Sequence, residues 1–279
     1  MTRVVDAHVH LWKADDGFHD WLASPVLAKI NTNFSSDELG ARTTLAGVDA
    51  VILVEGGTPT GEDTDLLLAQ TQASSRFAGV VAWIDLVAPD VERRIAELRA
   101  GPRGDRILGF RTQVQGENDD YLAREDVRAG LTAIGRASLP FELVIRHQQR
   151  PSVLALLDAL PDARLVVDHL GGPDFSAKRP SAEWTKWMRE LAKRSNVDAK
   201  LSALHAGESD DAGREELVAV ALATMAPSRL AWGSDWPMSL LHRTYAQTVA
   251  SARSLLAGLS ESERAAIFGG TAERVYGLA

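Results

Sequence analysis

Short apolar runs rich in β-branched residues recur eight times along this chain of 279 residues, and stretches with a helical pattern separate most of them. Most of the runs are nearly continuous rather than alternating, as expected for strands of a parallel sheet buried on both faces. Eight such strands with intervening helices predict one α/β domain over residues 1–279, a (β/α)8 TIM barrel. The predicted strands are 4–9, 49–55, 77–85, 106–112, 141–147, 163–169, 197–202 and 229–235.

The predicted helices agree with this interpretation. A doubly wound open sheet is the alternative fold, but it usually has fewer strands. Thr64 is a predicted N-cap, and Ser260 and Glu263 have the spacing of a capping box. The longest loops, 13–44 and 171–182, follow strands one and six, and in a barrel such loops shape the substrate pocket. The predicted helices are 64–75, 88–100, 124–137, 151–160, 181–194, 214–225 and 260–278.

Composition narrows the classes of partner. The net charge is −8 and no basic run is present, which argues against nucleic acid or an anionic membrane as a partner. The absence of cysteine excludes disulfides, thiolate metal ligands and a cysteine nucleophile. No secretory signal pattern or run of 18 apolar residues occurs, so we expect a cytoplasmic protein that acts on a small molecule. The sequence leaves open whether the chain forms a homo-oligomer.

Polar side chains stand at the ends of seven of the eight predicted strands. In a barrel, the carboxyl ends of all strands face one pocket, so residues more than two hundred positions apart converge there. This convergence predicts an active site. The residues are His8 and His10, Glu55, Arg111, Arg146 and His147, Asp168 and His169, Lys200, and Asp235.

His8 and His10 lie two residues apart on a strand, so their side chains project to the same face. Two imidazoles on one face suit a divalent metal, with a third ligand from His147 or His169 and a carboxylate from Asp235. The alternative is an ordinary strand with polar ends, which the acid and histidines of the other strands make less favourable.

Asp235, in the run GSDWP, is a candidate general base, because a buried carboxylate at the pocket mouth can take a proton from water. A turn acid or helix N-cap before Pro237 is the alternative. The neighbouring Trp236 is a candidate substrate-binding residue. Arg111 either clamps a substrate carboxylate or holds an ion pair, whereas Arg146 is interpreted as an ion-pair residue.

The remaining polar and aromatic residues are assigned more ordinary places. Burying the Lys200 ammonium without a partner would cost too much free energy, so Lys200 either faces the pocket or lies against an acidic side chain. Trp184 and Trp187 have helical spacing and are expected to pack on the barrel exterior. The loop residues His205, Glu208, Asp210 and Asp211 are expected to be solvated.

Motifs along nearly the whole chain resemble the amidohydrolase superfamily, and within it the amidohydrolase 2 group of sugar-lactone hydrolases, similar to fuconolactonases. The resemblance implies a (β/α)8 barrel that opens a lactone to a hydroxy acid, with Asp235 as general base. It places His8, His10 and His147 in the core of the site with Asp235, and His169 at the strand-six position. The matching motifs are DAHVHLW, GVVAWIDL, LPFELVIRHQQRP, VVDHLGGP, NVDAKLSAL, RLAWGSDWP and IFGGTAERVYGL.

The resemblance leaves the cofactor open, because members of the group differ in whether they use a divalent metal. One zinc or manganese ion on His8, His10, His147 and Asp235 is one prediction, and metal-free catalysis by imidazole donors is the other. A metal-dependent decarboxylase of an aromatic or unsaturated acid is the alternative function, and a non-catalytic ligand-binding barrel the remote one.

Three positions depart from the group's pattern and bear on the substrate. Glu55 stands where these lactonases usually have glutamine, Thr112 stands where histidine is frequent, and ALHAGE follows KLS in place of the usual residues. These departures leave the identity of the lactone open. The added carboxylate of Glu55 favours a cation or a substrate with donor groups over an anionic substrate.

Overall fold

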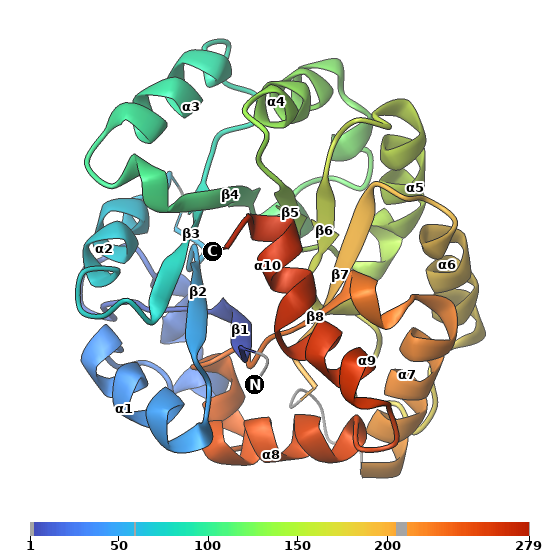
Figure 1. The fold of residues 1–279 in the computed structure, drawn as a ribbon. Helices are drawn as coiled ribbons and strands as arrows, with labels where there is room; N and C mark the ends of the chain where they lie inside the picture. Colours follow the sequence, from blue (N-terminus) through green and yellow to red (C-terminus); the bar gives the residue numbers. More distant parts are fainter. Residues whose placement is uncertain (1–2, 59, 205–210, 279) are drawn as a thin grey trace.

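A computed structural model describes residues 3–58, 60–204 and 211–278 of the chain. Eight strands form one parallel sheet in the order of the sequence, and helices surround it (Figure 1). The predicted (β/α)8 barrel is therefore confirmed. The strands are β1 (Val5–Val9), β2 (Ala50–Val54), β3 (Phe77–Trp83), β4 (Ile107–Thr112), β5 (Phe141–Leu143), β6 (Leu165–Val167), β7 (Val197–Leu201) and β8 (Leu230–Trp232).

The first and last strands meet just beyond the end of β8. The Asp235 N–H donates to the His8 carbonyl at 2.9 Å, and the His10 N–H donates to the Trp236 carbonyl at 2.7 Å. Gly233 permits this approach, because a Cβ there would lie 2.6 Å from the Cβ of His8. These contacts close the barrel at the carboxyl ends of its strands and bring the eighth strand's acid beside the first strand's histidines.

The helices follow the predicted alternation, with two additions. Helix α1 starts inside the predicted loop 13–44, and α8 was not predicted; α1 buries only Ser36, Leu39 and Thr43, so its apolar stripe is weak. The helices are α1 (Ser36–Ala46), α2 (Asp63–Gln70), α3 (Val91–Ala100), α4 (Glu125–Arg136), α5 (Arg150–Ala159), α6 (Ala182–Ala192), α7 (Asp211–Thr224), α8 (Tyr245–Leu255), α9 (Glu261–Ala265) and α10 (Thr271–Tyr276).

The helix caps divide into one confirmed prediction and one wrong one. Ser260 and Glu263 form the predicted capping box at the start of α9. Thr64 is not an N-cap, because α2 begins one residue earlier, at Asp63.

Trp184 and Trp187 on α6 are buried and donate their indole N–H groups to the carbonyls of Leu170 and Arg150, so they pack on the barrel exterior as predicted.

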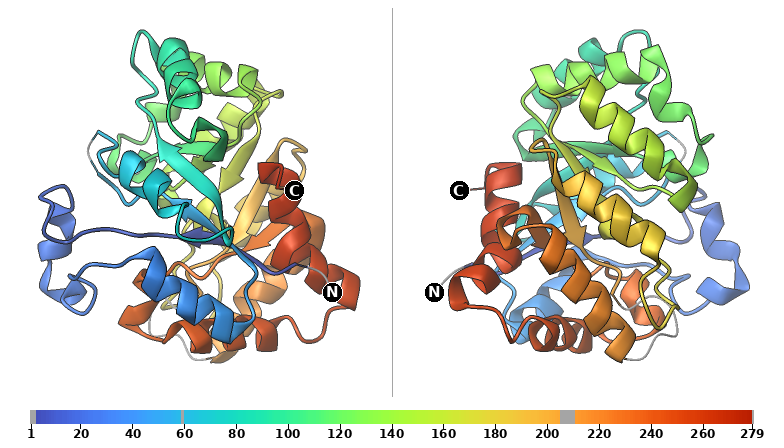
Figure 2. Two further views of the ribbon diagram at one scale, coloured as in Figure 1. Left: turned by 60° about the vertical axis from the view of Figure 1, so that its left-hand side comes forward. Right: turned by 90° about the vertical axis from the view of Figure 1, so that its right-hand side faces the viewer.

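The two ends of the barrel differ. Helix α10 lies across the middle of the ring of strands in Figure 1, and its Ala272, Val275 and Tyr276 pack against inward-facing residues of the strands. The segment between β1 and α1 protrudes from the molecule on the side away from the two chain ends (Figure 2). One end is therefore plugged by α10. No helix among the described residues is long and apolar enough to cross a membrane.

Candidate active site

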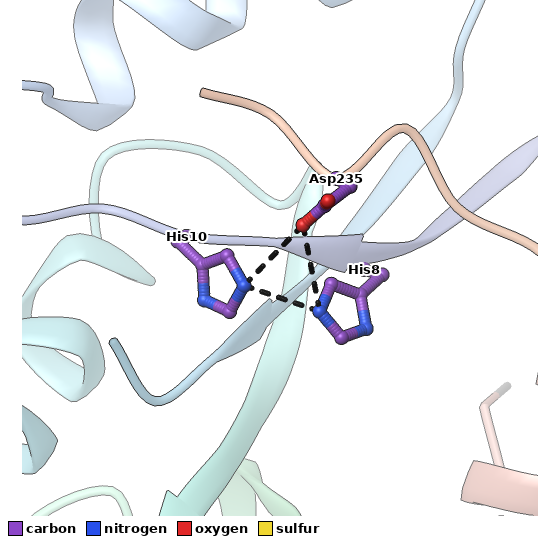
Figure 3. Close-up of side chains that lie close together, drawn as sticks. All are labelled: His8, His10 and Asp235. Atoms are coloured by element: carbon purple, nitrogen blue, oxygen red, sulfur yellow. Dashed lines mark hydrogen bonds and ion pairs between the residues drawn. The ribbon is translucent and has the colours of Figure 1, made fainter. Parts of the chain in front are cut away.

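His8, His10 and Asp235 form a compact buried group at the carboxyl ends of β1 and β8 (Figure 3). The Nε2 atoms of the two histidines lie 3.1 Å apart. Asp235 Oδ1 lies 3.8 Å from His8 Nε2 and 3.6 Å from His10 Nε2. Asp235 has a positive φ of 56°, an uncommon conformation for a residue with a side chain that is frequent at functional sites.

The other ring nitrogen of each histidine has its own partner. His10 Nδ1 lies 3.0 Å from the Val54 carbonyl, so it carries a proton and leaves Nε2 with a lone pair. His8 Nδ1 lies 3.4 Å from Asp168 Oδ1 and 3.1 Å from Lys200 Nζ. Burial, and then the Lys200 charge, hold the pKa of His8 well below its ordinary value, so the ring is neutral at neutral pH.

These residues fit a divalent metal ion. Two ligand atoms of a tetrahedral zinc ion lie about 3.3 Å apart, given Zn–N bonds of about 2.0–2.1 Å, close to the spacings in this group. A carbonyl behind His10 and a carboxylate behind His8 are the partners that metal-binding histidines usually have. The group is also complete without metal, because a Lys200 N–H that donates to His8 Nδ1 leaves the His8 proton on Nε2, where it can be donated to His10 Nε2 at 3.1 Å.

His169 is the third histidine of the site. It lines the pocket, and its ring centroid lies 4.6 Å from that of His8. Its Nδ1 lies 2.8 Å from the Ser202 hydroxyl. Burial lowers the pKa of His169, so the ring is neutral and offers one N–H.

His147 is not brought to this group. Its side chain is exposed on the 3-10 turn His147–Gln149 that follows β5, and it is absent from the metal-sized groups of the described residues. The predicted strand 141–147 ends at Leu143 instead. The early end turns His147 outward, so the predicted metal set is reduced to His8, His10 and Asp235.

Arg111 is held in an ion pair inside the barrel, one of its two predicted roles. Its Nε lies 2.5 Å from Glu55 Oε1, and its Nη1 lies 3.0 Å from Asp168 Oδ2. Glu55 is fully buried, and its other oxygen accepts from the Gly57 N–H at 2.7 Å. The carboxylate of Glu55 is therefore neutralised by Arg111 rather than presented to the pocket.

The other predicted polar residues are also placed. Lys200 is fully buried against an acid, with Nζ 2.6 Å from Glu142 Oε2. Arg146 is exposed and forms an ion pair with Asp119 at 3.1 Å, as interpreted. Trp236 is fully buried, so its predicted contact with substrate has no surface in this structure. His205, Glu208 and Asp210 lie outside the described residues, and Asp211 begins α7.

The pocket beside this group has a volume of about 460 Å³. Trp12 and Trp21 were not predicted as site residues, but both indoles line the pocket. Both lie in the segment after β1, so the predicted role of that segment in shaping the pocket is confirmed. The predicted loop 171–182 contributes no lining residue among those described. The lining residues are His10, Trp12, Trp21, Gly56, Gly57, Arg111, Gln113, Gln115, Gly116, Val144, His169, Asp235 and Met238.

Asp6 lies beneath the site and ties β1 to the segment after β8. It accepts hydrogen bonds from the Ser234 N–H at 2.8 Å and the Tyr245 hydroxyl at 2.9 Å. Burial raises the pKa of Asp6 to about 6, although these bonds oppose the shift. Between its unfolded value of 3.8 and about 6, the folded chain binds the proton more tightly than the unfolded chain.

The free energy of unfolding therefore loses the Asp6 contribution as pH rises through this window, by about 3 kcal/mol in total. We expect the Asp6→Asn variant to lack this loss, because its amide oxygen still accepts from Ser234 and does not titrate. Urea unfolding of both chains across the window measures the difference. A difference that does not change with pH would contradict the assignment.

The fold and site define a (β/α)8 barrel with a candidate metal-binding active site at the carboxyl ends of its strands. The family model for amidohydrolases matches residues 5–278, and the chain belongs to this family, which confirms the resemblance seen in the sequence.

Two curated relatives are named L-fucono-1,5-lactonase. The one from Burkholderia ambifaria is 34% identical and covers 86% of this chain and 82% of its own length. The one from Burkholderia multivorans is 32% identical and covers 98% and 96%. A solved amidohydrolase from Burkholderia multivorans with bound zinc is 30% identical, has a TM-score of 0.90, and covers 99% of this chain and 100% of that structure.

Proposed function

We propose that this chain hydrolyses a neutral sugar-acid lactone to its hydroxy acid, with Asp235 as general base. The observation that carries the proposal is the Asp235 carboxylate beside two imidazoles at the wall of a pocket with two indoles. The names of the two L-fucono-1,5-lactonase relatives support the same reaction.

The proposed mechanism uses these side chains in turn. Asp235 accepts a proton from water as the water oxygen bonds to the lactone carbonyl carbon. The ring C–O bond then breaks, and Asp235 returns the proton to the departing alkoxide. Where the Ser202 hydroxyl donates to Nδ1 of His169, the Nε2–H of that ring can donate to the developing oxyanion, a contribution of about 3 kcal/mol.

A divalent ion on His8, His10 and Asp235, when bound, supplies polarisation of the carbonyl and a lower pKa for water. The residues around it do not depend on that ion for their positions: the Val54 carbonyl orients His10, and Asp168 and Lys200 orient His8. We propose zinc or manganese as the ion. Because the histidines are oriented without it, the metal-free route is kept as the alternative.

The pocket favours a neutral substrate. Arg111 is the one guanidinium or ammonium among the described lining residues, and its charge is paired with Glu55 and Asp168. Trp12 and Trp21 suit the apolar faces of a sugar ring, and Gln113 at the rim carries an amide that suits hydroxyl groups. A carboxylate on the substrate would find no unpaired guanidinium or ammonium among the described lining residues.

A lactone panel tests the proposal. We expect aldono-1,4- and 1,5-lactones to give kcat/KM values about 100-fold above those of unsaturated dicarboxylic lactones, in an assay with a pH indicator. The same panel with and without chelator, together with the metal content, separates the ion-dependent route from the metal-free route. Turnover of the dicarboxylic lactones alone would contradict the neutral-substrate assignment.

The decarboxylase stays a prediction, and no contact of the described residues favours it. The family and the lactonase relatives indicate a hydrolase, which counts against the non-catalytic barrel. Release of carbon dioxide from an aromatic acid would support the first, and binding of a sugar acid without turnover of any lactone would support the second. Cytoplasmic location and a homo-oligomeric state also stay predictions from the sequence.

A further inference from the structure

Lys200, which the proposed mechanism uses only to orient His8, lies at the centre of a second buried group. It projects from β7 and is fully buried. Its Nζ lies 2.6 Å from Glu142 Oε2, 3.4 Å from Asp168 Oδ1 and 3.1 Å from His8 Nδ1. An ammonium has three N–H donors; the two carboxylate oxygens accept from it, and His8 Nδ1 accepts in the tautomer that carries its proton on Nε2.

The three partners of Lys200 are themselves a metal-sized group. Ligand atoms of His8, Glu142 and Asp168 all lie within 4.8 Å of one another, as do those of His8, His10 and Asp235. The two groups share His8, whose two ring nitrogens face one group each; the neutral ring has one lone pair, so ions in both groups at once would share it as an imidazolate. Removing the ammonium would leave two carboxylates and an imidazole arranged as metal ligands are.

The buried charges show why a cation is needed in this position. Glu142 Oε2 and Asp168 Oδ1 are buried and have no hydrogen bond of normal geometry among the described residues, so the Lys200 ion pairs neutralise them. Glu142 Oε1 accepts from the Tyr276 hydroxyl at 2.5 Å, which adds no charge. Two buried carboxylates without the ammonium would have to recruit another cation or protons.

We propose that the Lys200 ammonium is a built-in cation that fills a second metal-sized position, and that it limits this cluster to one divalent ion, at His8, His10 and Asp235. The chain thereby avoids a second ion on the other ring nitrogen of His8. A purely structural ion pair makes a different prediction, because its loss would lower stability and leave the metal content unchanged.

The test compares two variants that both lack the charge. Lys200→Ala leaves the space of the side chain, whereas Lys200→Met fills that space with an apolar chain. After equilibrium dialysis against zinc, we expect one more zinc ion per chain in Lys200→Ala than in the wild type, measured by plasma mass spectrometry. Lys200→Met should gain none, and Lys200→Ala with Asp168→Asn should lose the additional ion.

Anomalous diffraction of zinc-soaked crystals locates the ions. An additional peak among His8, Glu142 and Asp168 in Lys200→Ala supports the proposal. An unchanged zinc content in that variant, or a wild-type chain with ions in both groups, overturns it. If Lys200→Ala does not fold alone, refolding with zinc is the measurement: recovery supports the proposal, and failure to recover overturns it.

Discussion

Replacing Asp235 by asparagine is expected to lower kcat by about 10²- to 10⁴-fold, the usual contribution of a positioned general base. The amide cannot take a proton from water, but it has nearly the same size. The backbone N–H of residue 235 still donates to the His8 carbonyl, so the closure of the barrel is kept. Steady-state kinetics on the best lactone of the panel measures the loss, and thermal unfolding checks the fold.

His147→Ala is the matched control for this experiment. His147 was a predicted site residue, but its side chain is exposed and lies outside the group of His8, His10 and Asp235. We expect its kcat to be nearly unchanged. Wild-type turnover in Asp235→Asn would remove Asp235 from the mechanism, and a large loss in His147→Ala would return that histidine to the site.

Much of the fold could be predicted because the barrel buries both faces of its strands. Parallel strands of this kind are continuous apolar runs, and all eight were found. Their carboxyl ends were less predictable. Apolar residues such as Val144 and Ile145 continue past the end of β5, so the pattern does not mark where the strand stops and the turn that carries His147 begins.

The convergence of His8, His10 and Asp235 followed from topology alone, because each stands at a strand end. The pairing of the other charges did not. Glu142 lies between Phe141 and Leu143 in an apolar strand, and only the inward direction of its side chain shows that it meets Lys200. A carboxylate in the middle of a buried run was the available signal.

The net charge that the pocket wall presents could not be predicted either, because it depends on how two side chains pair. Glu55 and Arg111 are both strand-end residues, and the sequence left open whether Arg111 faces substrate or an acid. The structure pairs them at 2.5 Å and adds Asp168. Glu55 is buried and paired with Arg111, so it is not the free pocket carboxylate that the sequence predicted.

Arg111→Met is expected to lower the free energy of unfolding by about 3–5 kcal/mol, because it leaves Glu55 and Asp168 buried without their shared guanidinium. Burial alone would raise the pKa of Asp168, but Lys200, His8 and Arg111 together hold it well below its ordinary value, so part of that balance is lost. Urea unfolding at neutral pH measures the change.

The control is Arg146→Met, which removes the same charge from an exposed pair with Asp119 and should cost less than about 1 kcal/mol. Adding Glu55→Gln to Arg111→Met should recover part of the stability, because the amide carries no charge to neutralise. Equal losses of unfolding free energy for the buried and the exposed arginine would mean that groups other than Arg111 stabilise the buried Glu55 and Asp168 carboxylates. A loss confined to Arg111→Met, with recovery in the double variant, would show that the Arg111 charge is committed to the barrel and is not held for a substrate carboxylate.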